Sequence, residues 1–373
     1  MNRKYGHIIM VAMAVLMSTA CSHSSEDTTE QGGGVPVTDT RTAISFSGQQ
    51  GEEQAVSRGT NRRAGTPLSD TGVHAFTVWG YKSMDYSNGA YSDNQIVFPG
   101  YIVNWTANSA ATTTTNSNGW EYISSDPEQT IKYWDWSAKA YRFYAVTSGA
   151  GVPDVATAGQ VSFTMTADAS STTAMDNTPY FSKLWFSTGN VSVYPDKQFG
   201  KPVQLEFLKP FARVRFLFNY SYEAEGIKLT NPLFKPTDAS KKIDVKGTFT
   251  VTYPLTGTAT SESYTVTNID HSAGLAKFDK EYIPEGGVER EVWYTVLPID
   301  PSTTQGSYTL TVDVNGGNKS CVVPEQYMQW KPGFSYTYIF KITDDGGVEI
   351  DLVQSAFTPW DERESGNYEV YNW

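Results

Sequence analysis

The sequence has few of the residues that form metal, redox or phosphate sites. Its 373 residues include two cysteines, Cys21 and Cys321, and four histidines. These form no Cys-x-x-Cys, His-x-x-x-His or Cys–His set of the kind that binds zinc. The chain also has no glycine-rich phosphate loop, no Gly-x-Gly-x-x-Gly before a helix and no Gly-x-Ser-x-Gly nucleophile motif. We therefore expect no metal, no cofactor and no enzymatic activity.

Positive charge is scarce as well. Lysine and arginine together number 28 against 40 acidic residues, which gives a net charge of −12. Removal of residues 1–20, which contain Arg3 and Lys4 but no acidic residue, would make it −14. Phosphate backbones and anionic lipid surfaces repel a protein of this charge. Nucleic acid is therefore not an expected partner.

The chain lacks membrane-length apolar runs and sustained helical periodicity. Residues 8–17 are apolar throughout, but ten residues make about 15 Å of helix, roughly half of a bilayer core. Elsewhere, short segments of alternating apolar and polar residues are separated by Gly, Ser, Thr and Asn. Aromatic residues make up 14% of the chain, which suits strands better than helices. This pattern predicts an all-β protein.

The N-terminal segment predicts export and lipidation. Two basic residues precede the apolar run, and the small residues Ser18, Thr19 and Ala20 precede Cys21. This order is typical of a signal peptide. Its end resembles the lipobox of bacterial lipoproteins, whose cysteine is acylated, although Leu16 lies five residues before the cysteine rather than three. We predict a signal peptide over residues 1–20 and lipidation of Cys21, with an ordinary secretory signal as the alternative.

Residues 21–40 are polar and contain three consecutive glycines, which predicts a flexible tether behind the lipid. If Cys21 carries lipid, Cys321 is the one cysteine left, and no intrachain disulfide can form. The folded body must then depend on its apolar core. Cys321 lies in an apolar run and is expected to be part of that core.

A short alternating segment opens the folded body. Ile44 and Phe46 alternate with serines and predict a strand, and a long polar segment separates it from the next predicted strand at residues 75–81. The polar segment carries three arginines, Arg58, Arg62 and Arg63. Exposed arginines between a lone strand and its sheet are a candidate site for proteolytic release. The alternative is an ordinary first strand followed by a long loop.

Further strands are predicted in the next part of the chain, at residues 96–98, 101–105, 120–122, 141–145 and 184–186. Residues 150–180, rich in Ala, Ser and Thr, predict mostly loop. Residues 194–202 have the Pro and Gly content of an interdomain linker. The aromatic residues 133–136 could stack on a sugar or pack inside a sheet sandwich, and packing is the favoured interpretation.

Alternation is clearer after residue 203. It predicts strands at residues 203–207, 214–218, 246–251, 263–266, 292–296, 308–314, 321–323, 336–342 and 348–352. Hairpin turns are predicted at residues 315–318 and 344–347 from their Asn, Asp and Gly content. Together these strands predict antiparallel sheets with one solvated face. The tail after residue 354 ends in strand-like residues with no obvious place in a closed core.

Several motifs follow one another along the chain after the lipobox. They are Phe76-Thr-Val-Trp79-Gly-Tyr81, Tyr133-Trp134 with Tyr141-Arg-Phe143-Tyr-Ala145, Val203-Gln-Leu-Glu-Phe207 with Ala212-Arg-Val-Arg-Phe216, Trp330-Lys-Pro-Gly333-Phe-Ser-Tyr336-Thr-Tyr338, and Val348-Glu-Ile350-Asp with Trp360. In order and spacing they resemble the fimbrillin family, the type V pilins and fimbrillin-like lipoproteins of Gram-negative gut and oral bacteria. Pro210-Phe211 departs from the histidine that many members carry after the first central strand.

The resemblance implies two tandem antiparallel β-sandwich domains of transthyretin-like topology. We place them at residues 41–202 and 203–373. It also implies a lipid-anchored precursor at the outer membrane, a cell-surface fimbrium as destination, and other pilus subunits as partners. In pilus-forming members, an Arg-specific protease removes the first strand, and a C-terminal strand of the next subunit fills the vacated groove.

On this chain the released part would be residues 41–63, with Ile44 and Phe46 as the side chains that leave the core. Cleavage would follow one of the three arginines named above. The candidate donor tail is marked by Tyr368, Val370 and Trp373. We therefore predict a non-enzymatic pilus subunit that is assembled by donor-strand exchange and contributes to adhesion, with a host or bacterial surface ligand.

The alternative function is that of a surface glycan-binding lipoprotein with exposed aromatic rings as its platform. The candidate rings are Trp105, Trp120, Trp134 and Trp136. A glycoside hydrolase would need a paired acid and base, and no spacing among the many carboxylates singles out such a pair.

Overall fold

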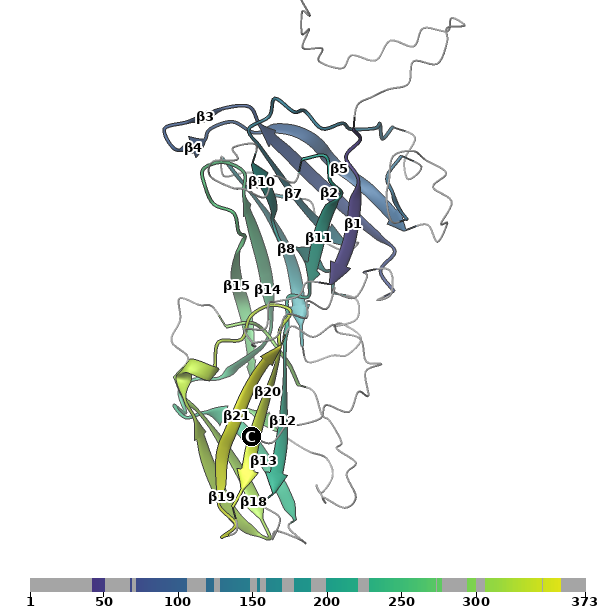
Figure 1. The fold of residues 1–373 in the computed structure, drawn as a ribbon. Helices are drawn as coiled ribbons and strands as arrows, with labels where there is room; N and C mark the ends of the chain where they lie inside the picture. Colours follow the sequence, from purple (N-terminus) through teal and green to yellow (C-terminus); the bar gives the residue numbers. More distant parts are fainter. Residues whose placement is uncertain are drawn as a thin grey trace, which may run out of the picture. The chain divides into compact units, whose positions relative to one another are not determined.

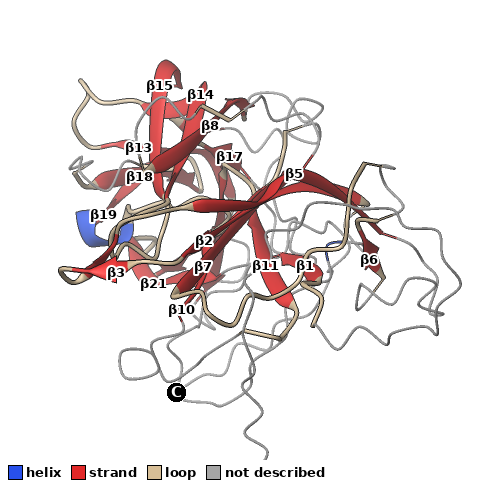
Figure 2. Cartoon of the chain, turned by 90° about the horizontal axis from the view of Figure 1, so that it is seen from above, coloured by secondary structure: helices blue, strands red, loops and turns tan. Residues whose placement is uncertain are grey.

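The computed structural model describes residues 42–50, 68, 72–105, 119–123, 128–147, 153–154, 159–169, 178–188, 199–220, 228–272, 274–276, 294–299, 306–343 and 345–356. Within these ranges the chain consists of strands, turns and loops, with no α-helix and with the short 3-10 turn η2 (Glu325–Tyr327) (Figures 1 and 2). No helix in this part of the chain is long and apolar enough to cross a membrane. The prediction of an all-β fold is confirmed.

The largest sheet gathers strands from residues 46–208. Its strands are β1 (Phe46–Gln50), β2 (Ala75–Ser83), β5 (Gln95–Trp105), β6 (Trp120–Glu121), β7 (Ala140–Thr147), β9 (Phe181–Ser182), β10 (Trp185–Thr188) and β11 (Val203–Leu208). They run in the order β1-β11-β9-β7-β2-β5-β6, and β10 also pairs with β7. The two separate strands predicted around residues 96–105 form the single strand β5.

A three-stranded sheet of order β15-β14-β8 packs on the large sheet. Its strands are β8 (Gln160–Asp168), β14 (Ile243–Pro254) and β15 (Ser263–Ser272). Tyr253 of β14 stacks on Tyr144 of β7 at a centroid distance of 4.3 Å, and its hydroxyl donates to the carbonyl of Ser182 at 2.8 Å. The predicted loop at residues 150–180 is wrong over β8, where Val161 and Phe163 alternate with polar residues and are fully buried. A small hairpin, β3 (Tyr86–Ser87) and β4 (Ala90–Tyr91), lies between β2 and β5 in sequence.

Two four-stranded sheets form a sandwich from the second half of the chain. One has the order β17-β12-β20-β21, with β17 (Tyr294–Val296), β12 (Ala212–Tyr220), β20 (Ser335–Ile342) and β21 (Val348–Ala356). The other has the order β16-β13-β18-β19, with β16 (Leu275–Ala276), β13 (Leu229–Pro236), β18 (Tyr308–Val314) and β19 (Gly317–Val323). Phe234 of β13 lies between them, with its ring 4.9 Å from Phe216 and 5.2 Å from Tyr338.

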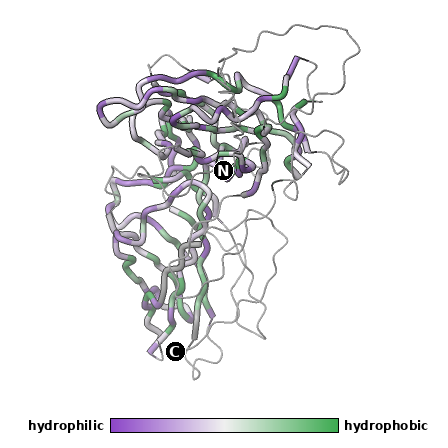
Figure 3. Tube along the Cα trace, turned by 45° about the horizontal axis from the view of Figure 1, so that its top comes forward, coloured by the Kyte–Doolittle hydropathy of each residue, from purple (hydrophilic) through white to green (hydrophobic). Residues whose placement is uncertain are grey.

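Buried and more exposed residues alternate along strands such as β8 and β18, and hydrophobic and hydrophilic stretches follow one another along the chain trace (Figure 3). β7 is different, because all eight of its residues are buried. Tyr141, Phe143 and Ala145 face one core cluster, whereas Tyr144 and Val146 face the other, which the three-stranded sheet covers. A central strand with a core on both faces cannot carry a solvated face.

The predicted hairpin between β18 and β19 is confirmed. Asn315 and Gly316 have φ angles of 51° and 82°, and both positive values are those of a type I′ turn. β20 and β21 also form a hairpin, with Ile342 opposite Val348, while Asp344 of the predicted turn lies outside the described residues. Most strand pairs are antiparallel, as expected, but β1–β11 and β12–β20 are parallel.

The strand pairings cross the boundary that we expected between residues 202 and 203. β11, which begins at Val203, pairs with β1 and β9 in the large sheet. The chain then adds β12 and β13 to the sandwich, returns with β14 and β15 to pair with β8, and re-enters the sandwich with β16. Alternation shows which face of a strand is buried but not which strand lies beside it, so the sequence pattern does not reveal this crossing.

The sandwich core should depend on one buried hydrogen-bond relay. Trp330 Nε1 donates to the Tyr338 hydroxyl at 2.9 Å, which in turn donates to the carbonyl of Tyr327 at 2.7 Å. Tyr338→Phe would leave a buried indole N–H without its acceptor, and we expect the free energy of unfolding in urea to fall by about 1–3 kcal/mol. The control Tyr86→Phe changes a ring that is 37% exposed and should stay within about 0.5 kcal/mol of the wild type. Equal effects of the two substitutions would contradict the relay.

Candidate functional site

Several predicted site residues lie outside the described part of the chain. These are Cys21 with the signal peptide at residues 1–20 and the tether at residues 21–40, the arginines Arg58, Arg62 and Arg63, and the tail residues Tyr368, Val370 and Trp373. Lipidation, cleavage and strand donation therefore stay predictions. The first strand, with Ile44 and Phe46, is described.

The first strand lies at one edge of the large sheet. β1 runs parallel to β11, with Phe46 opposite Val203 and Gln50 opposite Phe207. The residues just before β1 are held from a different segment, because Ile44 N donates to the Lys132 carbonyl at 2.8 Å. The segment 42–50 thus has backbone partners in two regions that are far apart in the sequence.

Phe46 and Ile44 are both fully buried. The Phe46 ring lies edge-on to Phe98 at a centroid distance of 5.0 Å, to Phe143 at 5.7 Å and to Tyr122 at 6.1 Å. Edge-to-face contacts of this kind add to the stabilisation from apolar burial alone. The pocket for Phe46 is therefore lined by rings from β5, β7 and the segment after β6.

Tyr122 gives this pocket a polar end. Its hydroxyl donates to the Ile44 carbonyl at 3.0 Å and accepts from Lys132 N at 3.2 Å. Burial raises the pKa of the Tyr122 phenol well above its usual value, so the group stays protonated and able to donate. If the first strand left, this buried hydroxyl would lose its acceptor, which favours a replacement backbone carbonyl at the same point.

The other face of the segment is polar and partly exposed. Ser45, Ser47 and Gln49 alternate with the buried residues, and Gln49 Oε1 accepts a hydrogen bond from Gln204 Nε2 at 2.6 Å. The segment is therefore an amphipathic edge strand with two fully buried apolar side chains, those of Ile44 and Phe46. Burying two such side chains stabilises the fold by about 3–6 kcal/mol, which is large beside the usual stability of a domain.

The four tryptophans proposed as a sugar platform do not share one environment. Trp120 and Trp134 are 2% and 4% exposed and belong to the core around Phe46. Trp105 is partly buried and packs on Trp120 at 5.4 Å. Trp136 is 54% exposed and lies against Gly200. The structure thus leaves Trp136, and in part Trp105, accessible to a ligand.

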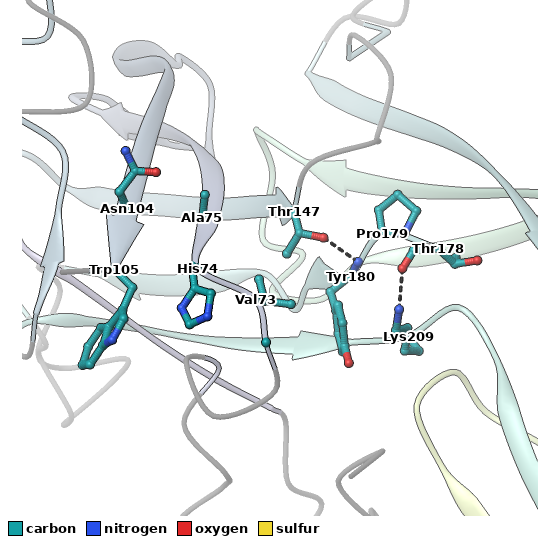
Figure 4. A pocket seen from close by; sticks show the side chains of 11 residues that line it. Val73, His74, Ala75, Asn104, Trp105, Thr147, Thr178, Pro179, Tyr180 and Lys209 are labelled. Carbon is teal, nitrogen blue, oxygen red and sulfur yellow. Dashed lines mark hydrogen bonds between the residues drawn. The ribbon is translucent and has the colours of Figure 1, made fainter. Parts of the chain in front are cut away.

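Trp105 also lines a hollow of about 560 Å³ at the ends of β2, β5, β7 and β11 (Figure 4). His74 lies beside it, and Trp105 N donates to the His74 carbonyl at 2.8 Å. Across the hollow, Lys209 Nζ donates to the Thr178 carbonyl and lies 4.1 Å from the centre of the Tyr180 ring. The lining thus combines an indole, an imidazole and an ammonium group. The sequence pattern did not predict that these three groups lie near one another.

Among the described residues, no three His, Cys, Asp or Glu side chains lie close enough to hold a metal ion. Sequence reasoning missed three residues that shape the pocket of the first strand, namely Tyr122, Lys132 and Leu68. Leu68 is fully buried in the same core, yet it stands alone in a polar segment with no periodic signal.

Comparison with known structures gives matches of low identity. A fimbrial protein from Bacteroides vulgatus is 12% identical with a TM-score of 0.40, and the match covers 84% of this chain and 99% of that one. A candidate cell adhesion protein from Bacteroides uniformis is 17% identical with a TM-score of 0.36, covering 86% and 99%. A candidate polysaccharide-binding protein from Bacteroides thetaiotaomicron is 10% identical with a TM-score of 0.31, covering 76% and 89%.

No curated protein matches the chain. A profile of the family described as fimbrillin-like matches residues 71–360, which agrees with the resemblance of the motifs along the chain. Because this match spans well over half of the 373 residues, the protein belongs to the fimbrillin-like family.

Proposed function

We propose that this protein is a non-enzymatic subunit of cell-surface pili that is assembled by donor-strand exchange and contributes to adhesion. Membership of the fimbrillin-like family supports a surface role of this kind. The observation that carries the exchange step is the placement of residues 42–50, an amphipathic strand at a sheet edge with Ile44 and Phe46 in the core. The precursor would be anchored to the outer membrane through Cys21, and a host or bacterial surface ligand would be the adhesive target.

Removal of the first strand would expose one edge of β11 together with the pockets of Ile44 and Phe46. An extended segment from another subunit could restore both the backbone hydrogen bonds and the apolar burial. β1 is parallel to β11, and parallel pairs are slightly less stable per residue than antiparallel ones. A donor strand that ran antiparallel to β11 would therefore form the more stable ladder.

Exchange of this kind joins a groove on one subunit to a tail on the next. Such a contact uses two different surfaces and does not close on itself, so it generates an open filament. The partners would be further copies of this chain or other pilus subunits. The donor would come from the tail that holds Tyr368, Val370 and Trp373.

Cleavage at the arginines between the first two strands should control assembly. In the variant Arg58→Ala/Arg62→Ala/Arg63→Ala, we expect the first strand to stay attached and the protein to remain monomeric after treatment with an Arg-specific protease. Wild-type protein on native cells should start just after one of these arginines when its N-terminus is determined by mass spectrometry. The control Arg41→Ala, which lies before the strand, should polymerise normally. Filaments formed by the triple variant would contradict the proposal.

We expect the tail to be needed for filament growth after cleavage, and not for the cleavage itself. Deletion of residues 366–373 should leave proteolysis unchanged but stop filament growth, because the groove then has no donor strand. Electron microscopy and size-exclusion chromatography of the cleaved protein would measure this. The substitution Asn367→Ala, next to the predicted donor residues, serves as the control and should leave filaments intact. Filaments of normal length from the truncated chain would place the donor elsewhere.

The alternative function, glycan binding, is favoured by one observation, the exposed ring of Trp136. If that ring stacks on a sugar, Trp136→Ala should weaken binding on a printed glycan array about two- to tenfold. Tyr327→Ala, which removes a ring that is 38% exposed in the sandwich, should change nothing. The absence of any array signal from the wild-type protein would end this alternative.

A further inference from the structure

The first strand has a third inward position, and glycine occupies it. Ile44, Phe46 and Gly48 are all buried, with partly exposed residues between them. The two large side chains fill pockets, whereas Gly48 adds no side chain to the core. Along the inward face of the strand, a large aliphatic residue is therefore followed by an aromatic residue and then by glycine.

Glycine is needed at position 48 because a larger residue would not fit there, and not because the backbone has a conformation that only glycine adopts. Its φ angle is not among the positive ones, so any residue could adopt its backbone. A Cβ atom at this position would lie 3.2 Å from Leu68 Cδ2 and 3.3 Å from Phe207 Cε2, closer than side chains normally approach. A β-branched side chain would add a further carbon or two in the same place.

The limit on the size of the residue at position 48 is set by residues of the groove, one of which is Leu68. It is fully buried, and it follows Arg63 in the sequence, so it stays on the chain after cleavage at any of the three arginines. Phe207 belongs to β11, which pairs with the first strand and also stays. The wall that faces Gly48 would thus remain when the strand leaves.

We propose that Leu68 and Phe207 select the incoming strand by size. Building on the proposed donor-strand function, the accepted partner is an extended peptide with an aromatic residue at the middle inward position, a large aliphatic residue on one side of it and Gly on the other. A residue larger than Ala at the third position is rejected. The filter thus decides which tails, from this chain or from other subunits, can occupy the groove.

Peptides offered to the cleaved full-length chain would test this filter. The probe is a fluorescent peptide with the sequence of residues 42–50, and its uptake after limited Arg-specific digestion is followed by anisotropy. We expect the Gly48→Val peptide to bind about tenfold more weakly or worse, because the valine side chain would overpack against Leu68 and Phe207. Valine has the higher strand propensity, so propensity alone would change binding in the opposite direction. The Ser47→Val peptide, altered on the outward face, is the matched control and should bind like the parent.

A size change in the wall should reverse the effect. Leu68→Ala in the receiving chain should restore binding of the Gly48→Val peptide while leaving uptake of the parent peptide measurable. Equal binding of the parent and Gly48→Val peptides to the wild-type chain would overturn the filter and leave donor-strand exchange standing. Failure of the parent peptide to enter the cleaved chain at all would instead overturn the proposed function, and the filter with it.

Discussion

The packing around Phe143 is the contact on which the large sheet depends. Its ring, on the central strand β7, lies 5.7 Å from Phe46, 5.9 Å from Phe98 and 5.4 Å from Trp185. Gly80 on β2 makes room for it, since a Cβ there would lie 2.5 Å from Phe143 Cε1. The pocket that holds the first strand is therefore part of the main core, and its shape is set by residues of other strands, which would remain if the first strand were released as proposed.

Short-range patterns in the sequence predicted a hairpin turn and the burial of individual strand residues. The Asn315-Gly316 turn was predictable because both residues tolerate positive φ, and the burial of Ile44 and Phe46 because they alternate with serines. Arg142 shows the limit of such reasoning. It lies in a strand buried on both faces, with its guanidinium 4.8 Å from the Phe186 ring, where alternation would have placed it in water.

The strand at the candidate site could be predicted from the sequence, but the residues that surround it could not. Tyr122 and Leu68 are brought to Ile44 and Gly48 by long-range folding, and nothing near them in sequence marks this. The strand β8 was missed because its Ser and Thr residues suggested a loop, although they occupy the solvated face of a paired strand. Composition alone cannot distinguish a polar loop from the exposed side of a sheet.

The path of the chain between its sheets bears on how the protein would carry load in the proposed filament. The backbone passes from the large sheet to the sandwich after β11, returns for β14 and β15, and passes back before β16. A tensile force that enters at the groove beside β11 and leaves beyond β21 is therefore shared by three covalent connections and by the paired length of β8 and β14. Stretching one linker would not separate the two halves, so extension of such a subunit would require the β8–β14 ladder to shear.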